Sequence, residues 1–206
     1  MCSPNFYEAP QGAPIPSGAG KYIITMNSWG DIDGRPNQLF ISTSSDLRIW
    51  STYAPLGSSR TAGDRAIDAA VAWIPMPAPA SVSVSRAGTA SEAYNDINNA
   101  TGLVNQWVLA YKDGAGKTRF GVSDSLDGNF SDPLHGSLPQ FQYRGGKASS
   151  ATHENFQFFH GPDAKLRIVT SDYGSGTVGR ETWVYTQAQD GDLSNWVDGF
   201  AVPVDK

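Results

Sequence analysis

The chain has 206 residues and a formal net charge of −5, with 15 Lys and Arg against 20 Asp and Glu. This length is enough for one domain with a substantial core. The small number of basic residues argues against nucleic-acid binding, and no apolar run approaches the ~20 residues of a membrane span. The single cysteine, Cys2, cannot form an internal disulfide, and three histidines without a cysteine cluster predict no metal site and no cofactor.

The composition is typical of secreted proteins, because Gly, Ser, Asn and aromatic residues are frequent and Lys is scarce. Residues 99–101 and 129–131 also fit the N-glycosylation sequon. The first residues have neither a basic start nor an apolar segment, so they do not form a secretory signal. We therefore expect an extracellular protein whose signal peptide is not part of this sequence.

Short runs of β-branched and aromatic residues alternate with Gly, Pro, Asn and Asp, which is the pattern of strands separated by turns. Strands are predicted at residues 21–26, 38–43, 66–73, 106–111, 118–123, 166–170 and 182–186. Residues 1–20 and the linker 131–150 are expected to be irregular. Residues 75–105 begin with three prolines and are too long for an ordinary connection, so they predict a surface insertion. No long helical period occurs, and the predicted fold class is all-β.

A corner containing leucine closes each of three successive units, at residues 45–50, 125–130 and 192–196. A repeat of this kind indicates one supersecondary unit stacked on its neighbours. Many short strands with a repeated corner favour a β-propeller over a sandwich or a barrel. We predict a single domain, 1–206, with three four-stranded antiparallel blades. The approximate blades are 5–60, 65–140 (with the insertion 75–105) and 150–200.

Several of these segments resemble the five-bladed β-propeller glycoside hydrolases of families 43 and 62. The corners at 45–50 and 192–196 resemble the "Ser-x-Asp-Leu-x-x-Trp" blade ends of that family. Residues 66–68, before an apolar run, resemble the segment with the second, non-base aspartate. Residues 153–159 resemble "Phe-Glu-Gly-x-Gln-Val-Tyr", which carries the general acid, and residues 6–10 resemble "Phe-Phe-Glu-Ala-Pro". The resemblance covers most of the chain apart from the insertion.

The resemblance implies an inverting, arabinofuranosidase- or xylosidase-like hydrolase of plant-type polysaccharides. It assigns Glu154 as the general acid and Asp68 as the carboxylate that tunes and orients it. Acidic residues at the starts of successive innermost strands would face each other across one channel, and we expect their carboxyl groups within ~10 Å. Each residue also has a structural reading, as a turn or strand-edge carboxylate.

Further side chains are candidates for binding a carbohydrate substrate: Glu8, Trp29, Trp73, His153 and Tyr173. Flat aromatic faces suit the C–H surfaces of sugar rings, and Glu8 is a candidate third channel carboxylate. The structural alternatives are core or inter-blade packing for the aromatic residues, a flexible N-terminal position for Glu8, and a solvated or hydrogen-bonded ring for His153.

The sequence also departs from the family pattern. It has three units rather than five, Asn155 replaces a glycine, and no Asp-Pro segment precedes Lys21 to supply the catalytic base. We therefore expect no more than trace activity. We also expect the isolated chain to be unstable, to self-associate through open propeller ends, or to be part of a longer protein.

Two alternative functions remain. The first is a non-catalytic carbohydrate-binding or degenerate propeller protein, which the missing base favours. The second is a sialidase-like propeller, although residues 45–50 lack the glycine of the sialidase Asp-box.

Overall fold

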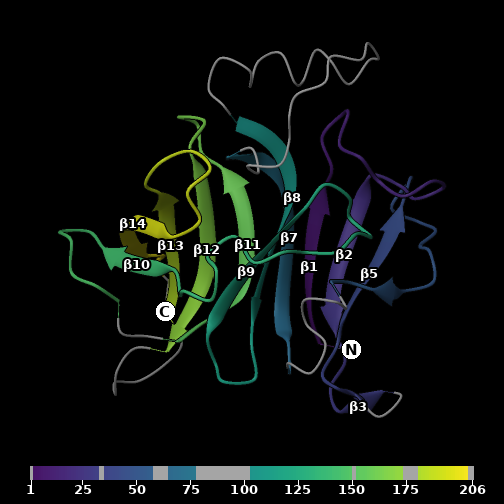
Figure 1. The fold of residues 1–206 in the computed structure, drawn as a ribbon, viewed down its shortest axis with the longest axis horizontal. Helices are drawn as coiled ribbons and strands as arrows, with labels where there is room; N and C mark the ends of the chain where they lie inside the picture. The colour runs from purple at the N-terminus through teal and green to yellow at the C-terminus, as the bar shows by residue number, and fades with distance from the viewer. Residues whose placement is uncertain are drawn as a thin grey trace.

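The protein is an all-β fold whose three main sheets follow one another along the chain (Figure 1). The computed structural model describes residues 2–32, 35–57, 65–77, 103–149, 152–173 and 181–203. Within these ranges every regular element is a strand, which confirms the predicted fold class. The same ranges contain no helix that is long and apolar enough to cross a membrane.

The first sheet is antiparallel, with strand order β1-β2-β5-β6. Its strands are β1 (Cys2–Glu8), β2 (Tyr22–Asn27), β5 (Leu39–Ser44) and β6 (Ala54–Pro55), and the small hairpin of β3 (Asp31–Ile32) and β4 (Arg35–Pro36) lies between β2 and β5. The expectation that residues 1–20 are irregular is wrong for β1. Phe6 and Tyr7 pair with Ile24 and Ile23, so two apolar segments align in one ladder.

The second sheet has strand order β7-β8-β9 and is antiparallel. Its strands are β7 (Ile67–Pro77), β8 (Leu103–Lys112) and β9 (Thr118–Ser123), and a bridge between Val122 and Ser131 adds one more pairing. The predicted insertion is wrong at its two ends, because Pro75 pairs with Asn105 and Pro77 with Leu103. Proline is tolerated there since β7 is an edge strand of its sheet. Residues 78–102 of that prediction lie outside the described residues.

The third sheet has strand order β10-β14-β13-β12-β11. Its strands are β10 (Gln140–Tyr143), β11 (Thr152–His160), β12 (Leu166–Tyr173), β13 (Glu181–Gln187) and β14 (Asn195–Ala201). The strands β11 to β14 are antiparallel, whereas β10 pairs with β14 in parallel. The linker predicted at 131–150 therefore contains a strand, which is held there because Phe141 packs on Trp196 and Tyr185. The sheets have four, three and five strands rather than four each.

The repeated corner follows the third strand of each sheet, counted from β1, β7 or β11. It leads to the segment that pairs with that third strand: β6 in the first sheet, the bridge at Ser131 in the second and β14 in the third. In each corner a carboxylate accepts a hydrogen bond from a serine hydroxyl: Ser44 to Asp46, Ser125 to Asp127 and Ser194 to Asp192. Leu126 and Leu193 are buried against the sheet that precedes theirs in the chain, whereas Leu47 is 49% exposed. The first corner differs because no described sheet precedes it.

The middle sheet forms the centre of the core, since both of its faces are covered. Along β7, Ala69 and Val71 pack toward the first sheet, and Ala70, Ala72 and Ile74 pack toward the third. A strand that is buried on both faces reads as a continuous apolar run, as residues 69–74 do. The small alanine side chains let the neighbouring sheets approach closely.

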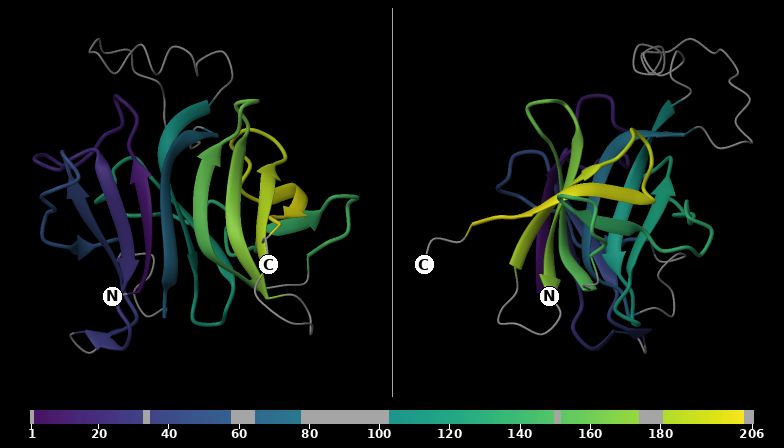
Figure 2. Two further views of the ribbon diagram at one scale, coloured as in Figure 1. Left: turned by 180° about the vertical axis from the view of Figure 1, so that it is seen from behind. Right: turned by 90° about the vertical axis from the view of Figure 1, so that its left-hand side faces the viewer.

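The first strands of the three sheets, β1, β7 and β11, lie side by side and run in the same direction (Figures 1 and 2). Hydrogen bonds set their register. The N–H of Trp73 donates to the Tyr7 hydroxyl at 2.9 Å, and the Gln157 amide donates to the carbonyl of Phe6 at 3.0 Å. We call the end at which these strands begin the lower end and the end at which they finish the upper end, as in Figure 1.

We expect Trp196→Ala to destabilise the protein by ~3–5 kcal/mol, because it removes a fully buried ring that joins the second and third sheets. The matched control is Trp29→Ala, whose ring is 75% exposed and should cost less than ~1 kcal/mol. Urea denaturation of the two variants measures both values. Equal losses would contradict this account of the core.

Candidate functional site

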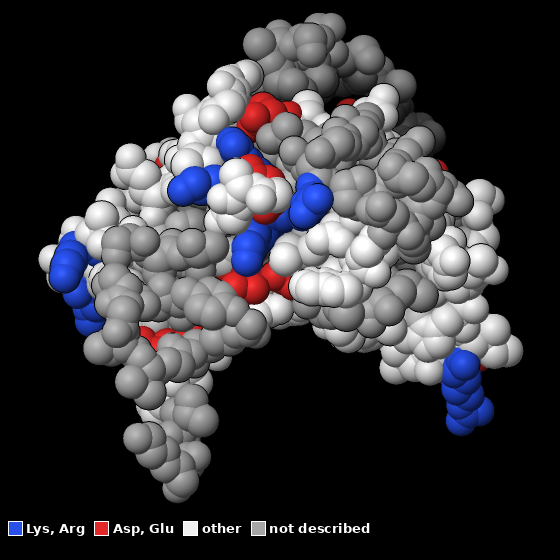
Figure 3. Space-filling model, turned by 90° about the horizontal axis from the view of Figure 1, so that it is seen from below, with Lys and Arg blue, Asp and Glu red and all other residues white. Residues whose placement is uncertain are grey.

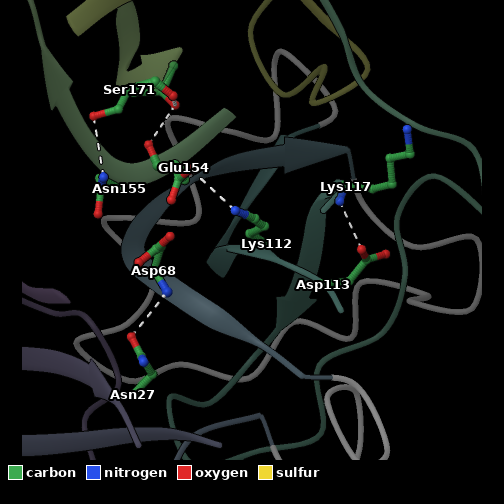
Figure 4. Close-up of polar contacts among 9 residues, drawn as sticks. Asn27, Asp68, Lys112, Asp113, Lys117, Glu154, Asn155 and Ser171 are labelled. Atoms are coloured by element: carbon green, nitrogen blue, oxygen red, sulfur yellow. Dashed lines mark hydrogen bonds and ion pairs between the residues drawn. The ribbon is translucent and has the colours of Figure 1, made fainter. Parts of the chain in front are cut away.

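Two buried carboxylates lie at the lower end, on the first strands of the second and third sheets. Asp68 is the second residue of β7, and Glu154 is the third residue of β11. The two strands contact each other, and Figure 4 shows the two carboxyl groups lying toward each other. The structure therefore brings together the two residues that the sequence assigned as catalytic.

The first strand of each of the three main sheets has an irregular register near its start. The interruptions fall between Cys2 and Asn5 in β1, between Ile67 and Ala70 in β7, and between Glu154 and Gln157 in β11. An extra residue in one strand of an antiparallel pair is a β-bulge, which re-aims the side chains around it. The three bulges therefore direct side chains at the same end of the molecule.

The bulge residues of β7 and β11 are Asp68 and Asn155, with φ angles of 60° and 55°. Asp and Asn adopt this left-handed conformation more readily than other residues with a side chain. Asn155, which replaces a glycine of the family pattern, thus takes a conformation that suits glycine. Within its own ladder, Asp68 has the same place at the bulge as Asn155 and not as Glu154, so the two carboxylates do not occupy equivalent positions.

The first sheet holds Asp68 in place. The Asp68 N–H donates to the side-chain oxygen of Asn27, the last residue of β2, at 3.3 Å. The carbonyl of the next residue, Ala69, accepts bonds from the Thr25 hydroxyl at 2.6 Å and the Asn5 amide at 2.8 Å. Within the described residues the Asp68 Oδ2 atom is buried and has no hydrogen-bond partner, so it is an acceptor that a bound molecule can use.

The second sheet supplies a counter-ion for Glu154. The Nζ atom of Lys112, the last residue of β8, lies 3.3 Å from Glu154 Oε1, and both side chains are largely buried. The Thr170 hydroxyl donates to the Glu154 carbonyl at 2.8 Å. Beside it, the Asn155 amide donates to the Ser171 hydroxyl at 3.3 Å (Figure 4).

Lys112 is the residue of this cluster that sequence reasoning missed. Its only sequence signal is its place between the predicted strand 106–111 and the turn that starts at Asp113. The Asp113 carboxylate ties that turn by accepting the N–H groups of Ala115 and Lys117, each at 2.9 Å. The turn fixes where β8 ends, and so it fixes the position of Lys112 beside Glu154.

His153 does not share a space with its neighbour Glu154, since adjacent residues of a strand point to opposite faces. Its ring packs against Phe141 with centroids 4.1 Å apart and against Tyr185 at 5.3 Å. Its Nε2 atom lies 3.3 Å from the Ser149 hydroxyl. Burial lowers the pKa of His153 to about 4, so the imidazole is neutral near pH 7. This packing fits the structural alternative better than a substrate contact.

The other candidates are divided between the two ends. Trp29, two residues after Asn27, and Tyr173, the backbone partner of Thr152, belong to the lower end. Glu8 and Trp73 lie at the upper end, where both line one pocket. The candidates of the sequence analysis therefore do not form a single site.

The lower end carries side chains of both charges. Seen from below, Asp and Glu side chains lie next to Lys and Arg side chains near the middle of this face (Figure 3). Across the described ranges, no group of three or more His, Cys, Asp or Glu is placed to hold a metal ion. Two buried carboxylates beside one ammonium group can bind hydroxyl groups and can transfer protons.

Comparison of this chain with protein-family models, with curated proteins and with solved structures gave no significant match.

We expect His153 to make folding stability depend on pH. The folded protein resists protonating this ring until about pH 4, whereas the unfolded chain takes up the proton near pH 6.5. The stabilisation is therefore complete above pH 6.5 and is lost as the pH falls toward 4, by ~3 kcal/mol in total. Denaturant titrations of wild type and His153→Phe between pH 4 and 7 measure it.

The free energy of unfolding of wild type should fall steadily relative to that of His153→Phe as the pH falls from about 6.5 to 4. His135→Asn is the control, because His135 is exposed and asparagine also accepts its φ of 50°. A His153→Phe variant with the same pH dependence as wild type would show that the buried ring does not cause the effect.

We expect Lys112 and Glu154 to be energetically coupled. Lys112→Met leaves a buried carboxylate without its counter-ion and should cost ~2–4 kcal/mol, whereas adding Glu154→Gln should recover much of that loss. Urea denaturation of both single variants and the double variant gives the coupling energy. Additive losses would mean that the ion pair contributes no interaction energy.

Proposed function

We propose that the three sheets are consecutive blades of a β-propeller of the glycoside-hydrolase type. Three observations support this. The sheets follow the chain order, their first strands meet at the centre, and each corner connects the same two strand positions. These features are expected when small antiparallel sheets are arranged around one axis.

We propose further that the lower end binds plant-type polysaccharides or oligosaccharides outside the cell and hydrolyses their O-glycosidic bonds. The single observation that carries this proposal is the pair of buried carboxylates, Asp68 and Glu154, on contacting innermost strands. Inverting glycosidases need an acid that protonates the leaving oxygen and a carboxylate that activates water ~6.5–9.5 Å away on the opposite face of the sugar.

In this mechanism the Glu154 carboxylate first takes up a proton from solvent and then delivers it to the glycosidic oxygen, while the attacking water releases its own proton to solvent. Asp68 orients Glu154 and binds a sugar hydroxyl through its unpaired Oδ2 atom. Lys112 is a positioning residue, because its ammonium group holds the Glu154 carboxyl at the channel and offers a counter-charge when the proton leaves. The exposed ring of Trp29 at the same end provides a flat surface for a neighbouring sugar.

The lack of a water-activating carboxylate on β1 limits the rate in this proposal. By its place at the bulge, Ser3 of β1 is the equivalent of Asp68, and Cys2 is the equivalent of Ile67 and Glu154. Glu8, the acid of this strand, belongs to the upper end. A missing general base typically costs ~10²–10⁴-fold, so the turnover we propose is trace turnover.

The same observation favours a second candidate, a propeller that binds carbohydrate without cleaving it. In that case Asp68 and Glu154 accept hydrogen bonds from sugar hydroxyls, and the Lys112–Glu154 ion pair is part of the binding surface.

The test measures hydrolysis of aryl α-L-arabinofuranosides and aryl β-xylosides, together with binding of the corresponding oligosaccharides. We expect Glu154→Gln to lower the trace turnover by ~10²-fold or more and Asp68→Asn to lower it by ~10-fold or more. Glu181→Gln, which changes an exposed carboxyl group in β13, is the matched control and should leave turnover unchanged.

Turnover that survives in Glu154→Gln would refute the catalytic role. No turnover, together with oligosaccharide binding that weakens in Asp68→Asn, would support the second candidate. Absence of both turnover and binding would overturn both proposals.

A further inference from the structure

A second pocket lies at the upper end, where β1, β7 and β11 finish. It has a volume of about 580 Å³, within the ~300–1,000 Å³ that is usual for ligand sites. The lining side chains that matter for recognition are Phe6, Glu8, Trp73, Asn105, Gln157 and Phe159. The pocket is therefore built from all three innermost strands and from β8.

Aromatic rings on two of these strands are partly exposed, and one of them is held in place by stacking on a neighbouring ring. Phe6 is 45% exposed and stacks on Tyr22, with centroids 6.1 Å apart and planes at 24°. Phe159 is 39% exposed at the end of β11. Between them Trp73 is packed against Trp107 at 5.6 Å. Apolar rings that are fixed at a surface bind flat C–H faces with little loss of side-chain entropy.

Hydrogen-bonding groups surround these rings. The Glu8 carboxylate is paired with Lys21 at 2.5 Å, which cancels its charge while it remains half exposed. The Gln157 amide is oriented by its bond to the carbonyl of Phe6. The indole N–H of Trp73 is buried and has no hydrogen-bond partner among the described residues.

We propose that this pocket is a second carbohydrate-binding site for a neutral oligosaccharide. Sugars present the two surfaces that the pocket matches, because their C–H faces stack on aromatic rings and their hydroxyl groups both donate and accept hydrogen bonds. The Trp73 side chain lines the same pocket as Phe6 and Phe159 and adds a third aromatic ring to it. The paired charges of Glu8 and Lys21 favour an uncharged ligand over an ionic one.

The two ends of the strands cannot contact the same sugar ring. Positions 68 and 73 of β7 are five residues apart, which corresponds to roughly 16 Å along a strand. The upper pocket therefore anchors a separate ring or chain rather than the bond at Asp68 and Glu154. The choice of plant-type sugars as probes rests on the proposed function, whereas the pocket itself does not.

The test is calorimetric titration of the full chain with xylohexaose, arabinohexaose and cellohexaose. The background is Glu154→Gln, which removes turnover and leaves the upper pocket intact. We expect one of the three to bind, and we expect Phe159→Ala to weaken its affinity by ~10-fold or more, since the variant removes the apolar ring on which a sugar would stack. Phe200→Ala is the matched control, because Phe200 is also 39% exposed but does not line the pocket.

A second measurement reports on the pocket directly. The indole N–H resonance that disappears in Trp73→Phe should shift in wild type when the bound hexasaccharide is added. The Asp68→Asn change should not affect that shift. Loss of turnover in Glu154→Gln tests the proposed function, so the two proposals can fail independently.

Two results would overturn the second site. One is binding that is equally strong in Phe159→Ala and Phe200→Ala. The other is no change of the Trp73 resonance with any of the three hexasaccharides at millimolar concentration.

Discussion

The structure depends on the burial of the middle sheet on both faces. The side chains of residues 69–74 of β7 point alternately toward the first and the third sheet. The same strand therefore contributes to both hydrophobic cores, one on each of its faces. Hydrophobic burial is non-directional and does not by itself fix register. The hydrogen bonds among β1, β7 and β11 do that, since they align the three strands in one direction. As a result, the starts of the strands meet at one end and their finishes meet at the other.

The bulges near the starts of these strands place polar side chains at the lower end. A regular strand would place every second side chain in the core, and Asp68 would then alternate strictly with its apolar neighbours. The left-handed residues Asp68 and Asn155 interrupt that alternation and place polar groups at the rim of the core. Bulges are frequent next to functional sites for this reason. The neighbouring second strands complete the arrangement, because Asn27 and Lys112 each reach across to the next sheet.

The all-β class and most strand positions could be predicted from the sequence, because strand and turn residues alternate clearly along the chain. β1 and β10 could not be predicted, because their own residues do not specify a strand and they become strands by pairing with β2 and β14. Asp68 and Glu154 could be singled out because each lies before an apolar run in a segment that resembles a catalytic segment of the glycosidase family, and their catalytic roles stay predictions. Their one-residue offset, the partner Lys112 and the separation of Trp73 from Asp68 follow from register, which a single sequence does not encode locally.

The corner leucines pack in one direction along the chain. Leu126 and Leu193 pack backwards onto the sheet that precedes theirs in the chain, whereas Leu47 is exposed. Each later corner therefore completes its packing on a surface that has already been synthesised. During translation the N-terminal sheet emerges first, and each new sheet docks onto one that is already present. The order of the sheets along the chain is thus also the order in which their apolar surface can be covered as the chain leaves the ribosome.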